Sequence, residues 1–171
     1  NFGNETGSLT YIHPSKKLVI DQAYFHINGT KLGNVCQDLA FEGDKIYILS
    51  QLGPKNGGEG LLTIASSNSL EKVKVYNDKA LAQSTPTHIA VIRDHIYIRT
   101  ERDGILRGSS EGGFTPIAGT KKALKQRMAQ IGERIFALTK DNKILMIQGS
   151  QVVRELALSP AKPSGIAVSH D

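Results

Sequence analysis

The chain of 171 residues has one cysteine, no tryptophan and few aromatic side chains. A lone Cys36 excludes an internal disulfide and a zinc site built from cysteines, and its apolar neighbours predict a partly buried thiol. No stretch approaches the roughly 18 apolar residues of a transmembrane helix, and no signal peptide is recognisable. These absences exclude a disulfide-stapled scaffold and leave a folded protein of ordinary composition.

A concentrated basic surface is also missing. The net charge is +5, from 21 Lys and Arg against 16 Asp and Glu, but the basic residues are scattered along the chain. Nucleic-acid binding needs a concentrated basic face, often with stacking aromatics. We therefore expect no nucleic-acid partner.

What the sequence does contain is a recurring strand phrase. Residues 40–48 return as 90–98 and 129–137, and a fourth copy begins at 167–171. The alanines that open these copies are 50, 39 and 38 residues apart. A period near 40 with several short strands per repeat is typical of a β-propeller blade.

Each repeat predicts four antiparallel strands, with a tight polar turn between the first and the second. The fold prediction is therefore all-β, with blades of four antiparallel strands that make about half of a seven-bladed ring. The expected blades are residues 28–80, 81–120 and 121–160, with the outer half of another blade at 1–27 and the start of the next at 161–171. Residues 120–130 are good helix formers, but the repeat makes their end a strand and leaves a short helical turn near 121–125.

The sequence does not say how the propeller ring closes. A propeller must cover the edge strands of its terminal blades, and half a ring leaves two such edges. We expect a fragment of a longer polypeptide, since both ends of the chain cut through strands. The alternatives are a ring completed by a second copy and an open stack of blades.

Two stretches carry a family resemblance. Residues 1–11, and residues 28–38 followed by 45–48, resemble the YncE-like, YVTN-type seven-bladed β-propellers that Bacteroidetes carry as surface lipoproteins. The matching positions include Asn28, Gly29, Leu32, Gly33 and Gln37. The later blades match the generic repeat pattern, and the chain departs from the family in length.

The resemblance implies binding and not catalysis. It implies export to the outer surface or the periplasm, and as partners either a small molecule, a corrinoid by family resemblance, or an outer-membrane protein. It implies no cofactor, and no ligand motif of the family is matched residue by residue.

A candidate site follows from the blade pattern itself. Loops that enter the first strands and loops that join the second and third strands meet on one face of a propeller, where polar side chains can surround a central depression. Arginines there favour an anionic or hydrogen-bonding ligand. The candidate ligand-binding residues are Gln37, Asp38, Gln51, His88, Arg99, Glu101, Arg127 and Lys140.

Two other functions stay open at this point. A propeller hydrolase or lactonase would use a central divalent metal, but His88 has no ligand partner at metal spacing, and Asp38 with Glu101 falls short of a calcium cluster. No Gly-x-Ser-x-Gly elbow is present, so we expect no catalytic residue and no metal site. A purely structural surface-layer module is the third reading. Tyr47, Tyr97 and Phe136 occupy one repeat position, which predicts a packing role in the second strand.

Overall fold

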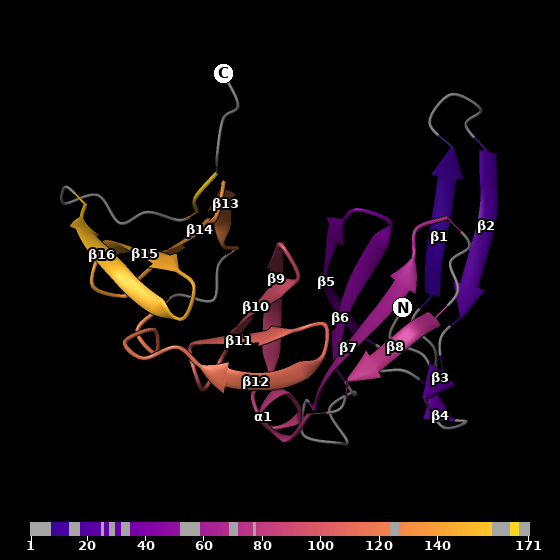
Figure 1. Ribbon diagram of the computed structural model, residues 1–171, viewed down its shortest axis with the longest axis horizontal. Coiled ribbons are helices and arrows are strands. Elements are labelled where there is room, and N and C mark those ends of the chain that lie inside the picture. The colour runs from indigo at the N-terminus through magenta and orange to yellow at the C-terminus, as the bar shows by residue number, and fades with distance from the viewer. Residues whose placement is uncertain are drawn as a thin grey trace.

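The computed structural model describes residues 8–13, 18–24, 26–27, 30–31, 35–51, 59–68, 72–76, 78–123, 127–158 and 165–167. These residues form three four-stranded antiparallel sheets and two shorter strand pairs (Figure 1). The predicted all-β architecture with four-stranded blades is confirmed. Of the stretches that carry the family resemblance, residues 1–7, 28–29 and 32–34 lie outside the described residues.

The three sheets are the three complete blades. The first blade contains β5 (Val35–Glu42), β6 (Lys45–Gln51), β7 (Gly60–Ser66) and β8 (Lys72–Tyr76). The second contains β9 (Pro86–Ile92), β10 (His95–Thr100), β11 (Ile105–Ser109) and β12 (Gly112–Pro116). The third contains β13 (Ala129–Ile131), β14 (Arg134–Leu138), β15 (Lys143–Gln148) and β16 (Gln151–Ala157).

Two shorter pairs precede them. Strand β1 (Ser8–His13) pairs with β2 (Leu18–Tyr24), and β3 (His26–Ile27) pairs with β4 (Thr30–Lys31). The first pair coincides with the strands expected for the outer half of a blade at 1–27. The blade boundaries themselves stay predictions.

Two-residue turns join the first two strands of every blade. In the second blade Ile92 pairs with His95, and the two residues between them, Arg93 and Asp94, have φ of 45° and 62°. A type I′ hairpin requires positive φ at both central residues. In the equivalent turns only the first central residue, Gly43 or Gly132, has positive φ, as a type II′ turn requires. His95 at the second turn is exposed as expected.

Neighbouring blades pack against each other through apolar side chains, which point alternately to the two faces of each sheet. Ile96 and Ile98 of β10 join a buried cluster with the first blade, whereas Tyr97 joins a second cluster with the third blade. Side chains of a strand point alternately to opposite faces, so the middle blade is buried on both sides. Figure 1 shows the result as an arc, with β5, β9 and β13 towards its concave side and β8, β12 and β16 outside.

The sequence analysis did not predict one short helix. Helix α1 (Lys79–Ala82) connects the first blade to the second, and the Asp78 carboxylate caps it by accepting from the N–H groups of Ala80 and Leu81. Leu81 is fully buried between the blades. An Asp followed by four helix formers is the signal for this turn.

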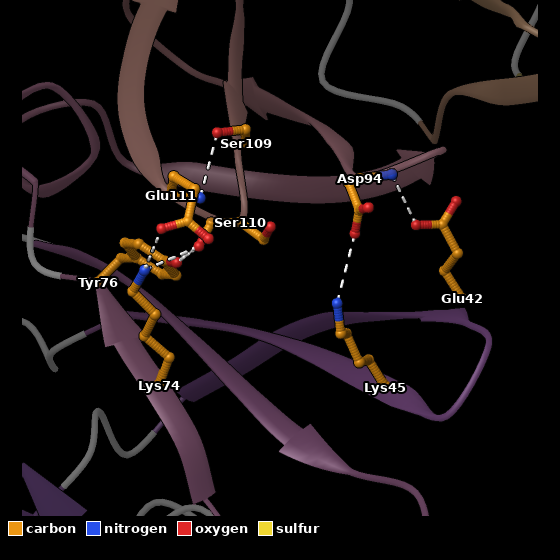
Figure 2. Close-up of polar contacts among 8 residues, drawn as sticks. All are labelled: Glu42, Lys45, Lys74, Tyr76, Asp94, Ser109, Ser110 and Glu111. Carbon is orange, nitrogen blue, oxygen red and sulfur yellow. Dashed lines mark hydrogen bonds and ion pairs between the residues drawn. The ribbon is translucent and has the colours of Figure 1, made fainter.

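Hydrogen bonds and ion pairs between turns join neighbouring blades at their surface. In Figure 2 the Asp94 N–H donates to Glu42 Oε2 at 2.8 Å, and Lys45 Nζ lies 3.4 Å from Asp94 Oδ1. Arg93 forms the equivalent ion pair with Glu133 of the third blade. All of these groups are exposed or half-exposed, so each pair contributes about 0–1 kcal/mol and serves mainly to set the register between blades.

Two local expectations need correction or refinement. Cys36 is exposed, against the expectation of a partly buried thiol, because it lies on β5, the edge strand at the concave side of the first blade, beside a bulge between Cys36 and Asp38. The predicted helical turn appears as a hydrogen-bonded turn, in which the Ala123 N–H donates to Thr120 O at 2.9 Å. Residues 124–126 lie outside the described residues.

The packing role predicted for the repeated tyrosines is confirmed, yet their hydroxyl groups differ. Tyr47 and Tyr97 are 0% and 2% exposed. The Tyr97 hydroxyl donates to Gly149 O at 3.1 Å, on the β15–β16 turn of the third blade. The Tyr47 hydroxyl has no hydrogen-bond partner among the described residues, because Tyr76 and Lys74 already donate to Ser110 O on the equivalent turn (Figure 2). Burial raises the pKa of Tyr47 to about 12, and nearby carboxylates add to the effect.

This difference predicts opposite outcomes for the same substitution. Tyr97→Phe should lower the free energy of unfolding by about 1 kcal/mol, the usual net worth of one buried hydrogen bond. Tyr47→Phe should leave it unchanged or raise it, since a buried hydroxyl without a partner costs free energy. Urea denaturation of both variants measures the two values, and an equal loss in both would contradict the assignment.

Candidate functional site

The carboxylate of Asp38 is the point where the three blades meet. Asp38 lies on β5, and its Oδ2 accepts from the Ile89 N–H of β9 at 3.2 Å. Its Oδ1 lies 3.0 Å from Arg127 Nη2, in the loop that enters β13. The Asp38 side chain is 9% exposed, whereas that of Arg127 is 71% exposed. One carboxylate therefore links the first strands of three successive blades and leaves most of a guanidinium facing solvent.

His88 lies beside this junction on β9 and is half-buried. The Thr87 hydroxyl donates its proton to Arg99 O at 3.1 Å, so it can only accept from His88 Nδ1, which lies 3.2 Å away. The neutral ring is therefore protonated at Nδ1 and carries its lone pair on Nε2. Burial lowers the pKa of His88; the charge of Asp38 raises it, and the charges of Arg127 and Arg99 lower it again.

Arg99 has a structural position and not the ligand-facing one that the sequence predicted. Its side chain is 2% exposed, with Nη1 donating to Gly104 O at 3.2 Å and Nη2 donating to Ala123 O. Burial lowers the pKa of Arg99 to about 10, partly offset by Glu101, so the group stays charged at neutral pH. Arg99 thus fastens the second blade to the loop that leads into the third.

The remaining candidates lie on the same ends of their blades but outside the Asp38 junction. Gln51 Nε2 donates to Pro86 O at 2.6 Å, a contact between the first and second blades. The N–H groups of Glu101 and Lys140 donate to the carbonyls of neighbouring loops, and both residues are exposed. Gln37 is half-buried on β5. The structure therefore brings together Asp38, His88 and Arg127, and Gln51, Glu101 and Lys140 make separate contacts.

A cleft adjoins the junction, and the sequence analysis missed it. Its volume is about 490 Å³. The residues that line it come from the first strands of the three blades and from the segment after the third: Leu39, Ala40, Phe41, Ile89, Ala90, Val91, Arg127, Met128, Ala129, Gln130, Ile166 and Ala167.

The lining of this cleft is only partly exposed, because Ile89 and Val91 belong to the core between the first two blades. Phe41 is 65% exposed and Leu39 is 36% exposed, although the repeat pattern marks both as ordinary residues of a buried strand. Period-2 apolar patterning cannot tell a strand that faces a core from one that faces a cleft. Leu39 and Phe41 of β5 are exposed because of how the blades are arranged around this strand.

The described part of the chain does not offer a set of side chains that could bind a metal ion. Among those residues, no three His, Cys, Asp or Glu side chains are grouped so that they could hold a metal ion. No helix of that part is long and apolar enough for a membrane span.

Comparison with solved structures gives the same fold. BamB from Moraxella catarrhalis is similar with a TM-score of 0.55 and 16% identity, over 84% of this chain and 39% of that one. BBS1N, solved in complex with ARL6DN, is similar with a TM-score of 0.63 and 10% identity, over 91% of this chain and 49% of that one. Glutaminyl cyclase from Myxococcus xanthus has a TM-score of 0.52 and 15% identity, over 95% and 73% of the two chains.

These three are β-propeller proteins, and the likeness shows the fold alone. The chain spans less than half the length of the first two. No curated protein matches it by sequence. A family model described as "Domain of unknown function (DUF5074)" matches residues 1–170.

The two arginines of the site predict different effects on stability. Arg99→Met should lower the free energy of unfolding by about 2 kcal/mol or more, because two carbonyls lose a charged donor in a buried position. Arg127→Gln removes an ion pair in which only the guanidinium is exposed, and it should lower the free energy of unfolding by less than Arg99→Met does, because the Asp38 carboxylate keeps its hydrogen bond from the Ile89 N–H. Chemical denaturation of both variants tests this, and a larger loss for Arg127→Gln would contradict the structural role of Arg99.

His88 predicts a dependence of stability on pH. Its pKa is lower in the folded protein than the ordinary 6.5, so the unfolded chain binds the proton more readily and acid favours unfolding. As the pH falls from about 7.5 to about 5, the wild type should lose more stability than His88→Gln. Urea denaturation at both pH values measures the difference, and parallel losses in the two proteins would show that His88 is not the titrating group.

Proposed function

Since this chain belongs to the family described as a domain of unknown function (DUF5074), we propose its function from its own geometry. It is a non-enzymatic binding propeller, and its ligand occupies the cleft beside the Asp38 junction. We call this side of the molecule the loop face, defined by the loops before β9 and β13 and those after β6, β10 and β14.

The observation that carries this proposal is a polar junction beside a cleft of ligand size. Small-molecule sites are typically mostly apolar hollows of about 300–1,000 Å³ with a few convergent polar groups. The cleft of about 490 Å³ falls in that range. Arg127 supplies a cation among the lining residues, and Asp38 and His88 lie beside it as an acceptor and a titratable ring.

A binding role accounts for the polar groups better than catalysis does. The Thr87 hydroxyl donates to a backbone carbonyl and accepts from His88, so the pair is arranged in the opposite sense to a nucleophile and its base. The alternative of a metal-dependent hydrolase or lactonase needs a ligand set that the described residues do not gather. The solved glutaminyl cyclase has the same fold, and at 15% identity that carries no activity to this chain.

The finer proposal rests on the sequence resemblance. We propose an exported protein of the outer surface or periplasm, similar to the YncE-like lipoproteins of Bacteroidetes, with a corrinoid as one ligand to test. A partner protein on the loop face is the second form of the same proposal. BBS1N was solved in complex with another protein, which shows that one propeller of this fold enters such a complex.

Thermal-shift screening tests the proposal. The purified chain is heated with a set of neutral, cationic and anionic small molecules that includes cyanocobalamin, because a ligand that binds the folded state raises the melting temperature. Gln130→Trp fills the cleft from an exposed lining position. Gln148→Trp, also exposed but on β15 outside the lining, is the matched control.

We expect at least one compound to stabilise the wild type and Gln148→Trp but not Gln130→Trp. Stabilisation of all three proteins alike would place the binding site elsewhere. A complete set without any stabilising compound would favour the structural surface-layer module.

A further inference from the structure

The inner strand of each blade has one edge without a ladder partner, and these strands line the cleft. Strands β5, β9 and β13 come first in the pairing order of their sheets and lie towards the concave side of the arc (Figure 1). In the part of the chain that the structure describes, no strand pairs with them on that side. A strand at a sheet edge presents backbone N–H and C=O groups that another strand can bond.

The register of the third blade shows which residue presents these groups on β13. Ile131 pairs with Arg134 across the two-residue turn, which makes them a hydrogen-bonded pair. Hydrogen-bonded and non-hydrogen-bonded pairs alternate along an antiparallel hairpin. Gln130, opposite Ile135, is therefore in a non-hydrogen-bonded pair and directs its N–H and C=O away from β14, towards the cleft that it lines.

Exposure distinguishes the edge of β13 from that of β9. Gln130 is exposed, and the three residues of β13 include no charge and no proline, the two kinds of residue that usually protect an edge. On β9 the Ile89 N–H is already bonded to the Asp38 carboxylate, and Val91 is only 5% exposed. The edge of β13 is therefore the more accessible to a further strand.

A cation marks the end at which β13 begins. Arg127 lies three residues before Gln130, about 10 Å along an extended chain, and it alone among the residues that line the cleft carries a formal charge. Its guanidinium is 71% exposed, and Nη2 lies 3.0 Å from Asp38 Oδ1. A guanidinium has five N–H donors, so donors remain for a second carboxylate. The edge of β5 offers the opposite charge, because Asp38 itself lies on that strand.

We propose that the cleft binds the C-terminal tail of a partner protein, which adds an antiparallel strand to the edge of β13 and places its terminal carboxylate on Arg127; this inference rests on the proposed binding function. The carboxylate end lies where β13 begins, so the added strand runs antiparallel to β13. The third residue from the end then lies opposite Gln130 and exchanges two backbone hydrogen bonds with it. Strand addition takes its affinity from main-chain hydrogen bonds, which suits a lining with few polar side chains.

Methylation of the peptide backbone tests the strand pairing without a change in the protein. Isothermal titration calorimetry of the whole chain uses the probe acetyl-Ser-Thr-Val-Thr-Val with a free C-terminus. N-methylation of the third residue from the end should weaken binding by about tenfold, because it removes a donor that faces β13. N-methylation of the penultimate residue, whose N–H faces away from β13, is the matched control and should leave binding unchanged.

A second pair of changes tests the carboxylate contact. The C-terminal amide of the probe should bind about tenfold more weakly than the free acid, the size of one charge-assisted contact. Arg127→Gln should weaken the free acid by a similar factor and leave the affinity for the amide unchanged, because both changes remove the same contact. Arg93→Gln, which removes an exposed arginine that pairs with Glu133, is the matched control and should bind the probe like the wild type.

Variants at Gln130 test the edge itself. Gln130→Pro removes a backbone donor that takes no part in the ladder with β14, a position at which an edge strand tolerates proline, and it should weaken the probe about as much as the methylated peptide shows. Gln130→Ala keeps the N–H and should bind the probe like the wild type. Urea denaturation establishes that both variants are folded, and the methylated peptides decide the question if Gln130→Pro is not.

Each result decides a distinct claim. Equal affinities of the two methylated peptides would overturn the strand pairing. An amide that binds as tightly as the free acid, or a loss in Arg127→Gln that is the same for both, would overturn the carboxylate contact. If the probe does not bind at all, this inference fails, while the proposed function fails only if the thermal-shift screen also finds no ligand.

Discussion

Every feature of this protein depends on the fact that a blade cannot bury its two apolar faces by itself. A four-stranded sheet with apolar side chains on both sides needs a neighbour on each side, as in other repeat architectures. Ile96 and Ile98 of β10 meet this need against the first blade and Tyr97 meets it against the third. Because the blades stack face to face, their first strands gather on one side, and the cleft and the Asp38 junction are consequences of that stacking.

Polar contacts between blades are of two kinds, exposed pairs at the turns and buried hydrogen bonds at the opposite end of the sheets. At the turns, pairs such as Lys45 with Asp94 are exposed and set register at little gain in stability. On the loop face, Arg99 is buried and satisfies two carbonyls from separate loops. A buried charge that is fully hydrogen-bonded specifies one arrangement of its neighbours more strictly than an apolar contact does, because leaving it unpaired is costly. Arg99 therefore fixes the second blade relative to the turn that contains Ala123.

The repeat pattern was sufficient to predict the strands and most of their partners. The first, second, third and fourth strands of each blade lie where the recurring phrase places them, since alternating apolar residues and two-residue turns act locally. Helix α1 was missed because four residues are too few to show a period. Cys36 was expected to be partly buried on the strength of its apolar neighbours, yet its strand has no partner on one edge, and sequence neighbours do not report that.

For the candidate site, the sequence by itself determined which residues occupy the loop face, because the blade repeat assigns each loop to one end of the sheet. Only the tertiary structure decided what those residues do. Arg99 and Arg127 are equivalent candidates in the sequence, but the first is buried against Ala123, 24 residues away, and the second reaches Asp38, 89 residues away, with most of its guanidinium in solvent. Contacts between blades depend on how whole sheets stack, and stacking is a property of the assembled faces that no local pattern encodes.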